Sequence, residues 1–479
     1  MSSAKLASTR LRHVLNRFSY GASPSLVERA QEAGGATAWF EQQLNHTAIA
    51  DDRAAAMKDW YPYIWHSPGE LWDIHESEEY YGWEMMTDLA RWTIMRRTYS
   101  KRQLHEVMAD FWSNLLHVPG WTDMAWPHRI AYDKTIRHNA LGRFEDMLIA
   151  AVLHPAMGCY LDNAISTKHS VNENLGRELL ELHSVGVEAG YDEQDVLNSA
   201  YLLTGYRVDM WDSWDAYYAK SDHWVGPVQV LGFSAANSKP DGRAVTLRYL
   251  RYLANHPATA RRIARRLCQR FASDHPSDAL VTAVANAFTS SGTDVKATLR
   301  ALITHPDFDA AVDDKVRTPA EDAIACYRLL GAKAERPNDD SDFARAVVWQ
   351  LQSMGQSPFD WPAPDGFPEY GAAWASVGRV LASLDLHLTL AGGWWPSQAV
   401  TYPSTKDRLP TMPARFDDIV DHVSRKLLQR RATTELQQAA SQRADAGAAQ
   451  VFDNAGDFGE WRMTLVMATV LDSPAHAAR

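Results

Sequence analysis

The sequence has few cysteines and no long uninterrupted apolar run. Its three cysteines, Cys159, Cys268 and Cys326, are far apart, and none forms a CxxC pair. This spacing argues against a disulfide framework and a thiolate metal site, and it predicts three buried thiols that pack as small hydrophobic side chains. No window approaches the ~18 uncharged apolar residues that a membrane span needs, so no membrane contact is expected.

Long basic segments are also missing. The chain has 479 residues, 46% of them apolar, and a net charge of −11. A nucleic-acid partner is therefore not expected. Residues 1–10 contain no apolar stretch of the kind found in secretory signals, which predicts a cytoplasmic protein with a soluble, mildly acidic surface.

The common catalytic motifs are absent as well. The sequence contains no HExxH, no pair of ExxH motifs, no glycine-rich phosphate loop and no GxSxG. Because no ligand spacing is complete, neither a bound metal nor a cofactor is expected.

Apolar residues recur with a helical period in almost every segment. In residues 101–117 the apolar stripe consists of Leu104, Val107, Met108, Phe111 and Leu115. This period predicts a mainly α fold: a large multi-helix domain over residues 1–400, with at most a short β-hairpin around residues 206–233. A helical, partly mobile extension is predicted for residues 401–479.

A tryptophan-rich insert is predicted at about residues 57–127. Eight of the 18 tryptophans lie there, from Trp60 to Trp126. Such density is typical of a thick aromatic core, which we favour, or of a platform on which sugars stack.

The most informative segment is the polar helix predicted over residues 172–183. Leu175, Leu179 and Leu182 share one face, and Asn174, Glu178 and Glu181 share the next. Arg177 lies one turn before Glu181, at the spacing of an ion pair. Two neighbouring carboxyl groups with unequal pKa values suit general acid and base catalysis, although a buried structural ion-pair network or a solvated surface would also explain the pattern.

We expect this helix to border a pocket that segments distant in sequence complete. The predicted catalytic residues are Glu178, Glu181, His183 and His223. The predicted substrate-binding residues are Asn174, Arg177, Trp112, Asp365 and Trp374.

Several segments together resemble the bacterial domain-of-unknown-function family numbered eighteen hundred, in its actinobacterial form. They include NRFSYGASP at 16–24, FWSN at 111–114, HNALGRF at 138–144, HPATAR at 256–261, KVRTP at 315–319 and PDGFP at 364–368. The resemblance extends from about Leu11 to Gly392. It implies a mainly helical fold but no activity, since the family has none assigned. Many members look secreted and are encoded beside proteins resembling sulfatases or alkaline phosphatases, which hints at extracellular polymers.

The chain departs from the family pattern at two positions. Leu115 stands where the family usually has a histidine, and Trp224 follows His223 where many relatives have aspartate. If those positions bind metal or carry protons elsewhere in the family, that function is lost here.

Three functions remain open at this point. The first is a hydrolase acting on a glycan or related polar small molecule through the carboxylate and histidine cluster. The second is a metal- or cofactor-dependent oxidoreductase that uses His183, His223 and the glutamates. The third is a non-catalytic binding or assembly protein, which the loss of histidine at position 115 favours.

Overall fold

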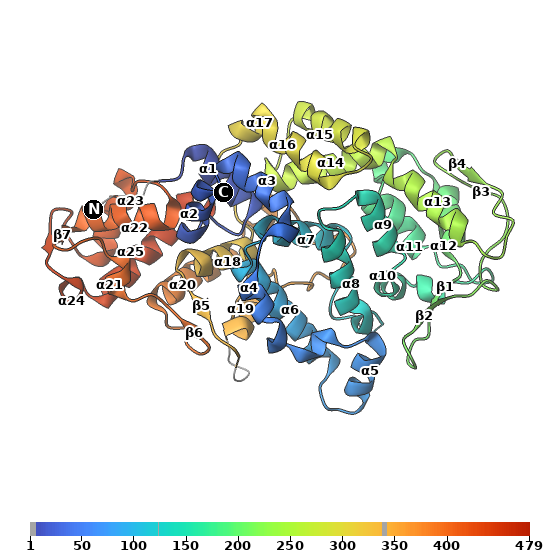
Figure 1. Ribbon diagram of the computed structural model, residues 1–479, viewed down its shortest axis with the longest axis horizontal. Coiled ribbons are helices and arrows are strands. Elements are labelled where there is room, and N and C mark those ends of the chain that lie inside the picture. Colours follow the sequence, from blue (N-terminus) through green and yellow to red (C-terminus); the bar gives the residue numbers. More distant parts are fainter. Residues whose placement is uncertain (1–5, 123, 338–342) are drawn as a thin grey trace.

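The computed structural model describes residues 6–122, 124–337 and 343–479 and confirms the mainly α fold (Figure 1). Within these residues, no helix is long and apolar enough to cross a membrane. All three cysteines are buried and unpaired by disulfides, as their spacing predicts.

The first half of the chain is helical up to residue 203. Its helices are α1 (Thr9–Phe18), α2 (Pro24–Glu32), α3 (Ala36–Leu44), α4 (Asp52–Ala56), α5 (Pro68–Glu76), α6 (Gly82–Tyr99), α7 (Gln103–Leu115), α8 (Trp126–Asn139), α9 (Phe144–Val152), α10 (Pro155–Tyr160), α11 (Asn174–Glu178) and α12 (Glu193–Leu203).

Short antiparallel strand pairs interrupt the helices. β1 (Tyr206–Val208) pairs with β2 (Ala216–Tyr218), and β3 (Val228–Val230) pairs with β4 (Phe233–Ala235), both in or next to the segment where a hairpin is predicted. The described residues therefore contain more strand pairs than the single hairpin that the sequence predicts. Besides these two pairs, β5 (Lys333–Ala334) pairs with β6 (Val400–Thr401), and β7 (Ala414–Arg415) pairs with β8 (Val451–Phe452). These last strands are two residues long and carry no periodicity that a sequence could show.

The remaining helices come after the hairpins. They are α13 (Arg243–Ala254), α14 (Pro257–Phe271), α15 (Asp278–Ser290), α16 (Val295–Thr304), α17 (Pro306–Ala310), α18 (Pro319–Leu329), α19 (Phe343–Ser353), α20 (Val377–Gly392), α21 (Thr405–Arg408), α22 (Phe416–Leu428), α23 (Thr434–Ala444), α24 (Ala455–Phe458), α25 (Glu460–Leu471) and α26 (Pro474–Ala477).

The apolar side chains form two hydrophobic cores, and α18 lies between them. One core is built from α1–α3 and from α7 through α17; the other contains α6, α18–α20 and the helices after residue 415. From α18, Ile324 joins the first core, whereas Ala323 and Tyr327 join the second. The residues on either side of position 400 therefore share one core. The partial mobility expected within residues 401–479 stays a prediction.

The tryptophan-rich insert contributes to both core and surface. Trp92, Trp112 and Trp126 are buried, whereas Trp65 and Trp83 are exposed. Trp72 also contacts Trp126, Trp211 and Trp214, with ring centroids 5.1–6.1 Å apart. The insert thus anchors a chain segment more than 130 residues away as well as filling the interior.

Candidate functional site

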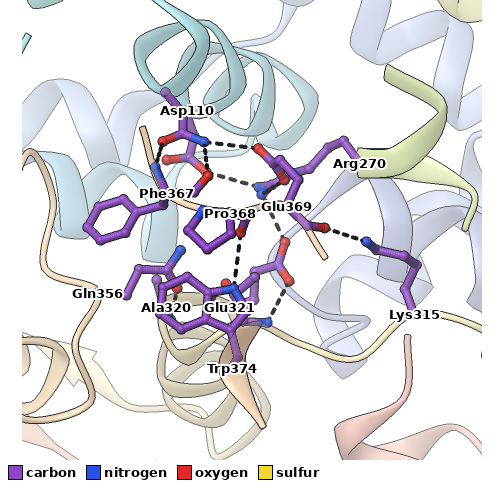
Figure 2. Close-up of polar contacts among 12 residues, drawn as sticks. Asp110, Arg270, Lys315, Ala320, Glu321, Gln356, Phe367, Pro368, Glu369 and Trp374 are labelled. Atoms are coloured by element: carbon purple, nitrogen blue, oxygen red, sulfur yellow. Dashed lines mark hydrogen bonds and ion pairs between the residues drawn. The ribbon is translucent and has the colours of Figure 1, made fainter. Parts of the chain in front are cut away.

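A buried arginine joins the two cores through three carboxylates. Arg270, near the end of α14, has a side chain only 4% exposed and lies 2.9 Å from Asp110, 3.3 Å from Glu321 and 3.0 Å from Glu369 (Figure 2). These partners come from α7, from α18 and from the loop at 357–374. A buried charge needs such partners, because its desolvation is otherwise not offset.

Further pairs balance the charge of this central network. Arg97 binds Asp110 at 2.5 Å, Arg479 binds Glu321 at 2.8 Å, and the Lys315 ammonium group pairs with Asp274. Burial raises the pKa of the Glu321 carboxyl group, but Arg479 and Arg270 outweigh this effect and hold the pKa at about 2. The carboxylate therefore remains ionised and paired.

The 357–374 loop is held against α7 beside this network. The Asn114 side chain donates to the Phe367 carbonyl at 2.8 Å and accepts from the Phe367 amide at 2.6 Å. A cavity of about 30 Å³ remains between Asp110, Asn114, His117 and the loop. It has room for about one water molecule but not for a sugar, so the central network is structural.

The predicted polar helix is present, but its second half has a wider turn. α11 continues as the π-helical turn η5 (Leu179–His183), which places Leu180 in the core with Leu175 and Leu179 and leaves Leu182 half-buried. The predicted core face is therefore wrong at Leu182, because one extra residue in the turn rotates the side chains after it.

Arg177 does not form the predicted ion pair with Glu181. It pairs with Glu193 at 2.6 Å and with Glu173 at 3.5 Å, and its side chain is 36% exposed. The expected buried pair is wrong, because α12 offers a carboxylate in a better position at the surface.

Glu178 and Glu181 lie half-buried and close enough to influence each other. Burial raises the pKa of Glu178, the charges of Glu181 and Asp365 raise it further, and only Arg177 opposes them. The Asp365 carboxylate accepts a 2.7 Å hydrogen bond from the Trp361 indole. The structure therefore brings together three of the predicted site carboxylates from two distant segments.

The two predicted histidines are buried in separate hydrogen-bonded surroundings. His183 Nδ1 lies 3.1 Å from the Leu115 carbonyl oxygen, and burial lowers its pKa to about 4. His223 contacts the Thr204 carbonyl and the Asn237 side chain, both at 3.0 Å. Neither imidazole hydrogen-bonds to Glu178 or Glu181 in the described part of the chain. The predicted carboxylate–histidine cluster is therefore wrong, because both rings are buried and bind the Leu115 carbonyl, the Thr204 carbonyl and the Asn237 side chain instead.

Of the remaining predicted residues, Trp112 is the clearest correction. It is fully buried and donates to the Ala140 carbonyl at 2.9 Å, so it cannot form the wall of a pocket. Asn174 is exposed and binds Asp162 at 2.8 Å. Trp374 donates to the Pro368 carbonyl at 3.1 Å and braces the 357–374 loop (Figure 2).

An arginine-lined groove lies beside η5 and was not predicted. Arg261, Arg262, Arg265 and Arg266 of α14 line a cavity of about 570 Å³, which residues 185–189 close on the other side. Arg262 donates to the Leu182 carbonyl at 2.9 Å, which joins the groove to η5. Burial and repulsion from Arg266 lower the pKa of Arg262, while the charge of Glu181, the residue before Leu182, raises it. The repeat RRIARR at 261–266 was a readable signal, but it is too short to count as a basic run.

Four potential metal ligands lie together elsewhere in the molecule. Asp322, Cys326, His387 and His476 are buried, and one ligand atom of each lies within 4.8 Å of all the others. The expectation of no bound metal rested on ligand spacing along the sequence, whereas these four residues come from helices far apart in sequence.

Comparison with known proteins identifies the family. The family model described as a protein of unknown function (DUF1800) matches residues 13–477, which confirms the resemblance and extends it beyond Gly392. No curated protein and no solved structure matches the chain.

Replacing Arg270 by alanine removes one partner from the buried carboxylates of Glu321 and Glu369 and from the half-buried carboxylate of Asp110. We expect Arg270→Ala to lower the free energy of unfolding by about 3–5 kcal/mol or to prevent folding. The matched change Arg177→Ala removes a surface pair and should cost less than about 1 kcal/mol. Urea unfolding of both variants checks this, and equal losses would contradict the structural role of the central network.

His183 should make the protein sensitive to acid. Its pKa in the folded state, about 4, lies below the ordinary value of 6.5, so the unfolded chain binds a proton first as the pH falls. The stability that the neutral His183 ring contributes is fully present above pH 6.5 and is lost as the pH falls from 6.5 to about 4. Between about pH 7 and pH 5, we expect the free energy of unfolding of His183→Gln to fall by about 2 kcal/mol less than that of the wild type. The change His169→Gln, at an exposed position, should leave the wild-type pH slope unaltered. Parallel slopes for all three proteins would show that His183 accepts a proton freely in the fold.

Proposed function

We propose that this chain, which belongs to the DUF1800 family, is a hydrolase acting on an anionic glycan or a related anionic polar substrate. The observation that carries the proposal is the arginine-lined groove, which Arg262 joins to the helical turn that holds Glu181 by its hydrogen bond to the Leu182 carbonyl. Small-molecule sites have volumes of about 300–1,000 Å³, and the groove lies within that range.

The charge of the groove indicates the substrate class. The chain carries a net charge of −11, yet four guanidinium groups gather along one side of α14. Arg261 and Arg265 share a single carboxylate, Asp278, at 2.9 and 3.4 Å. Donors therefore remain for a carboxylate, sulfate or phosphate group of a ligand, which planar guanidinium groups bind in pairs.

The two glutamates supply the chemistry that hydrolysis of a glycoside needs. Glu178, whose pKa is raised by burial and by its acidic neighbours, is suited to donate a proton to the leaving oxygen. Glu181, whose charge acts on Arg262, would serve as the carboxylate that activates water or attacks the sugar. Activity that depends on protonated Glu178 should fall as the pH rises through its pKa.

Binding without turnover is the second candidate. It is favoured by the burial of His183 and His223, which leaves the carboxylates without an imidazole partner at the surface. The presence or absence of product separates the two functions.

The binding arm of the test uses calorimetry with three anionic probes, namely oligouronate, sulfated and phosphorylated oligosaccharides, against a neutral oligosaccharide of equal length. We expect anionic probes to bind more tightly, and Arg261→Ala/Arg265→Ala to weaken their binding by about tenfold or more, equivalent to about 1.4 kcal/mol. Arg251→Ala, which removes an exposed charge on α13, is the control. Failure of all three probes, or equal affinity for the neutral one, would rule out this substrate class.

The catalytic arm measures the release of new reducing ends from the probe that binds. Glu178→Gln and Glu181→Gln should each lower turnover by about 100-fold or more while binding and melting temperature are retained. The control is Glu435→Gln, which changes an exposed carboxylate on α23, outside the groove lining. Unchanged turnover in either glutamate variant would disprove the assigned roles, and binding with no turnover in the wild type would favour the second candidate.

A further inference from the structure

The cluster formed by Asp322, Cys326, His387 and His476 is not explained by the proposed hydrolase. Asp322 and Cys326 lie one turn apart on α18, His387 lies on α20, and His476 lies on α26. All four side chains are nearly inaccessible, with exposed fractions of 5% or less. The cluster is thus remote from solvent, unlike the arginine-lined groove.

We propose that these four residues bind one zinc ion, which fastens α26 and α20 to α18. Cysteine sulfur, imidazole nitrogen and carboxylate oxygen are the ligands that zinc takes in proteins, and a structural zinc site is filled by four of them. No position is left for water or substrate, so the ion has a structural role.

The distances within the cluster suit a tetrahedral ion. Asp322 Oδ1 lies 2.9 Å from His476 Nε2 and 3.1 Å from His387 Nε2, and the Cys326 sulfur lies 3.5 Å from His476 Nε2 and 4.0 Å from Asp322 Oδ1. Zinc bonds of about 2.0–2.3 Å in tetrahedral directions require ligand atoms about 3.3–3.8 Å apart. These four pairs of ligand atoms need shifts of a few tenths of an ångström to accommodate the ion, and the remaining pairs, which lie within 4.8 Å, need at most about 1 Å.

The surrounding residues orient the ligands. His387 Nδ1 contacts the Asp472 carboxylate at 2.9 Å, which directs Nε2 toward the cluster, as outer carboxylates do for metal-bound histidines. Ser383 donates to Asp322 Oδ2 at 2.8 Å, and Arg379 lies 3.4 Å from the same oxygen, so Oδ1 is left facing the other ligands.

Hydrogen bonding alone accounts for the cluster less completely. Two histidines bound to Asp322 would satisfy its Oδ1 atom, but Cys326 would then contribute only long contacts of its sulfur. A zinc ion uses all four groups, and a thiolate and a carboxylate together neutralise its two positive charges. The charges of the ion and of its buried ligands therefore cancel at the position where α26, near the end of the chain, meets α18.

Elemental analysis of the full chain, purified without metal-affinity resin and dialysed against metal-free buffer, tests the proposal. We expect one zinc ion per chain in the wild type and in Cys268→Ser, which changes a buried thiol outside the cluster. Cys326→Ser and His387→Asn should each retain much less zinc. Absence of zinc both as purified and after incubation with zinc would overturn the proposal, and stoichiometric iron or copper in its place would overturn the choice of metal.

Cobalt substitution provides a readout that does not depend on the stability of the variants. A cobalt-loaded wild-type protein should show the visible bands of a tetrahedral ion and the near-ultraviolet absorption of a cobalt–thiolate bond. The thiolate band should be missing in Cys326→Ser and present in Cys268→Ser. A strong chelator should lower the Tm of the wild type and leave that of Cys326→Ser/His387→Asn unchanged. An equal chelator effect on both proteins, or a thiolate band that survives in Cys326→Ser, would contradict the site.

Discussion

The arrangement of the whole molecule depends on the charge of Arg270. A guanidinium group at this depth has a large desolvation penalty, which Asp110, Glu321 and Glu369 offset together. Because each carboxylate comes from a different element, the requirement to neutralise one buried cation fixes α7, α18 and the 357–374 loop relative to α14. The two hydrophobic cores meet at this point, so apolar packing alone does not set their relation.

The same constraint reaches the proposed site through the 357–374 loop. Glu369 anchors one side of this loop to Arg270, and Asn114 holds Phe367 by two hydrogen bonds. Asp365 lies between these anchors and Phe359, where its charge acts on Glu178. A carboxylate on a tethered loop thus raises the pKa of a helical glutamate, and a structural network contributes to the properties of a surface site.

The sequence predicted local features well and long-range ones poorly. The helical period identified the mainly α fold, and the hairpin region around residues 206–233 was recognised from its extended character. The clustering of Glu178 and Glu181 was expected from helical spacing. No sequence pattern marks the wide turn at Leu179–His183. This turn places His183 in the core and not at the predicted pocket. His223 was misplaced for another reason: nothing in the sequence shows that Thr204 and Asn237 would satisfy it.

The arginine-lined groove and the metal-ligand cluster escaped the sequence analysis, for different physical reasons. The groove arginines are adjacent in sequence, but a stripe of four charges on an amphipathic helix is usually solvated surface. Only the chain at 185–189, folding over α14, encloses them. In the metal-ligand cluster, Asp322 and Cys326 have helical spacing, whereas His387 and His476 are supplied from 61 and 150 residues beyond Cys326. Four ligands that converge only after folding leave no local motif.

One helix connects the interior with the proposed substrate groove. Arg262, Arg266 and Arg270 recur every four residues on α14 and therefore form one stripe. Arg262 lies at the groove and Arg270 in the central network, while Arg266 lines the groove and also lowers the pKa of the buried Glu369 carboxyl group. The positive charges of the groove and of the central network therefore belong to one row of arginines along α14. An anion bound between Arg262 and Arg266 would weaken the repulsion that lowers the pKa of Arg262. The same row of guanidinium groups therefore lines the surface groove and, at its buried end, neutralises the carboxylates on which the two cores meet, so a change of charge at Arg266 is expected to affect both.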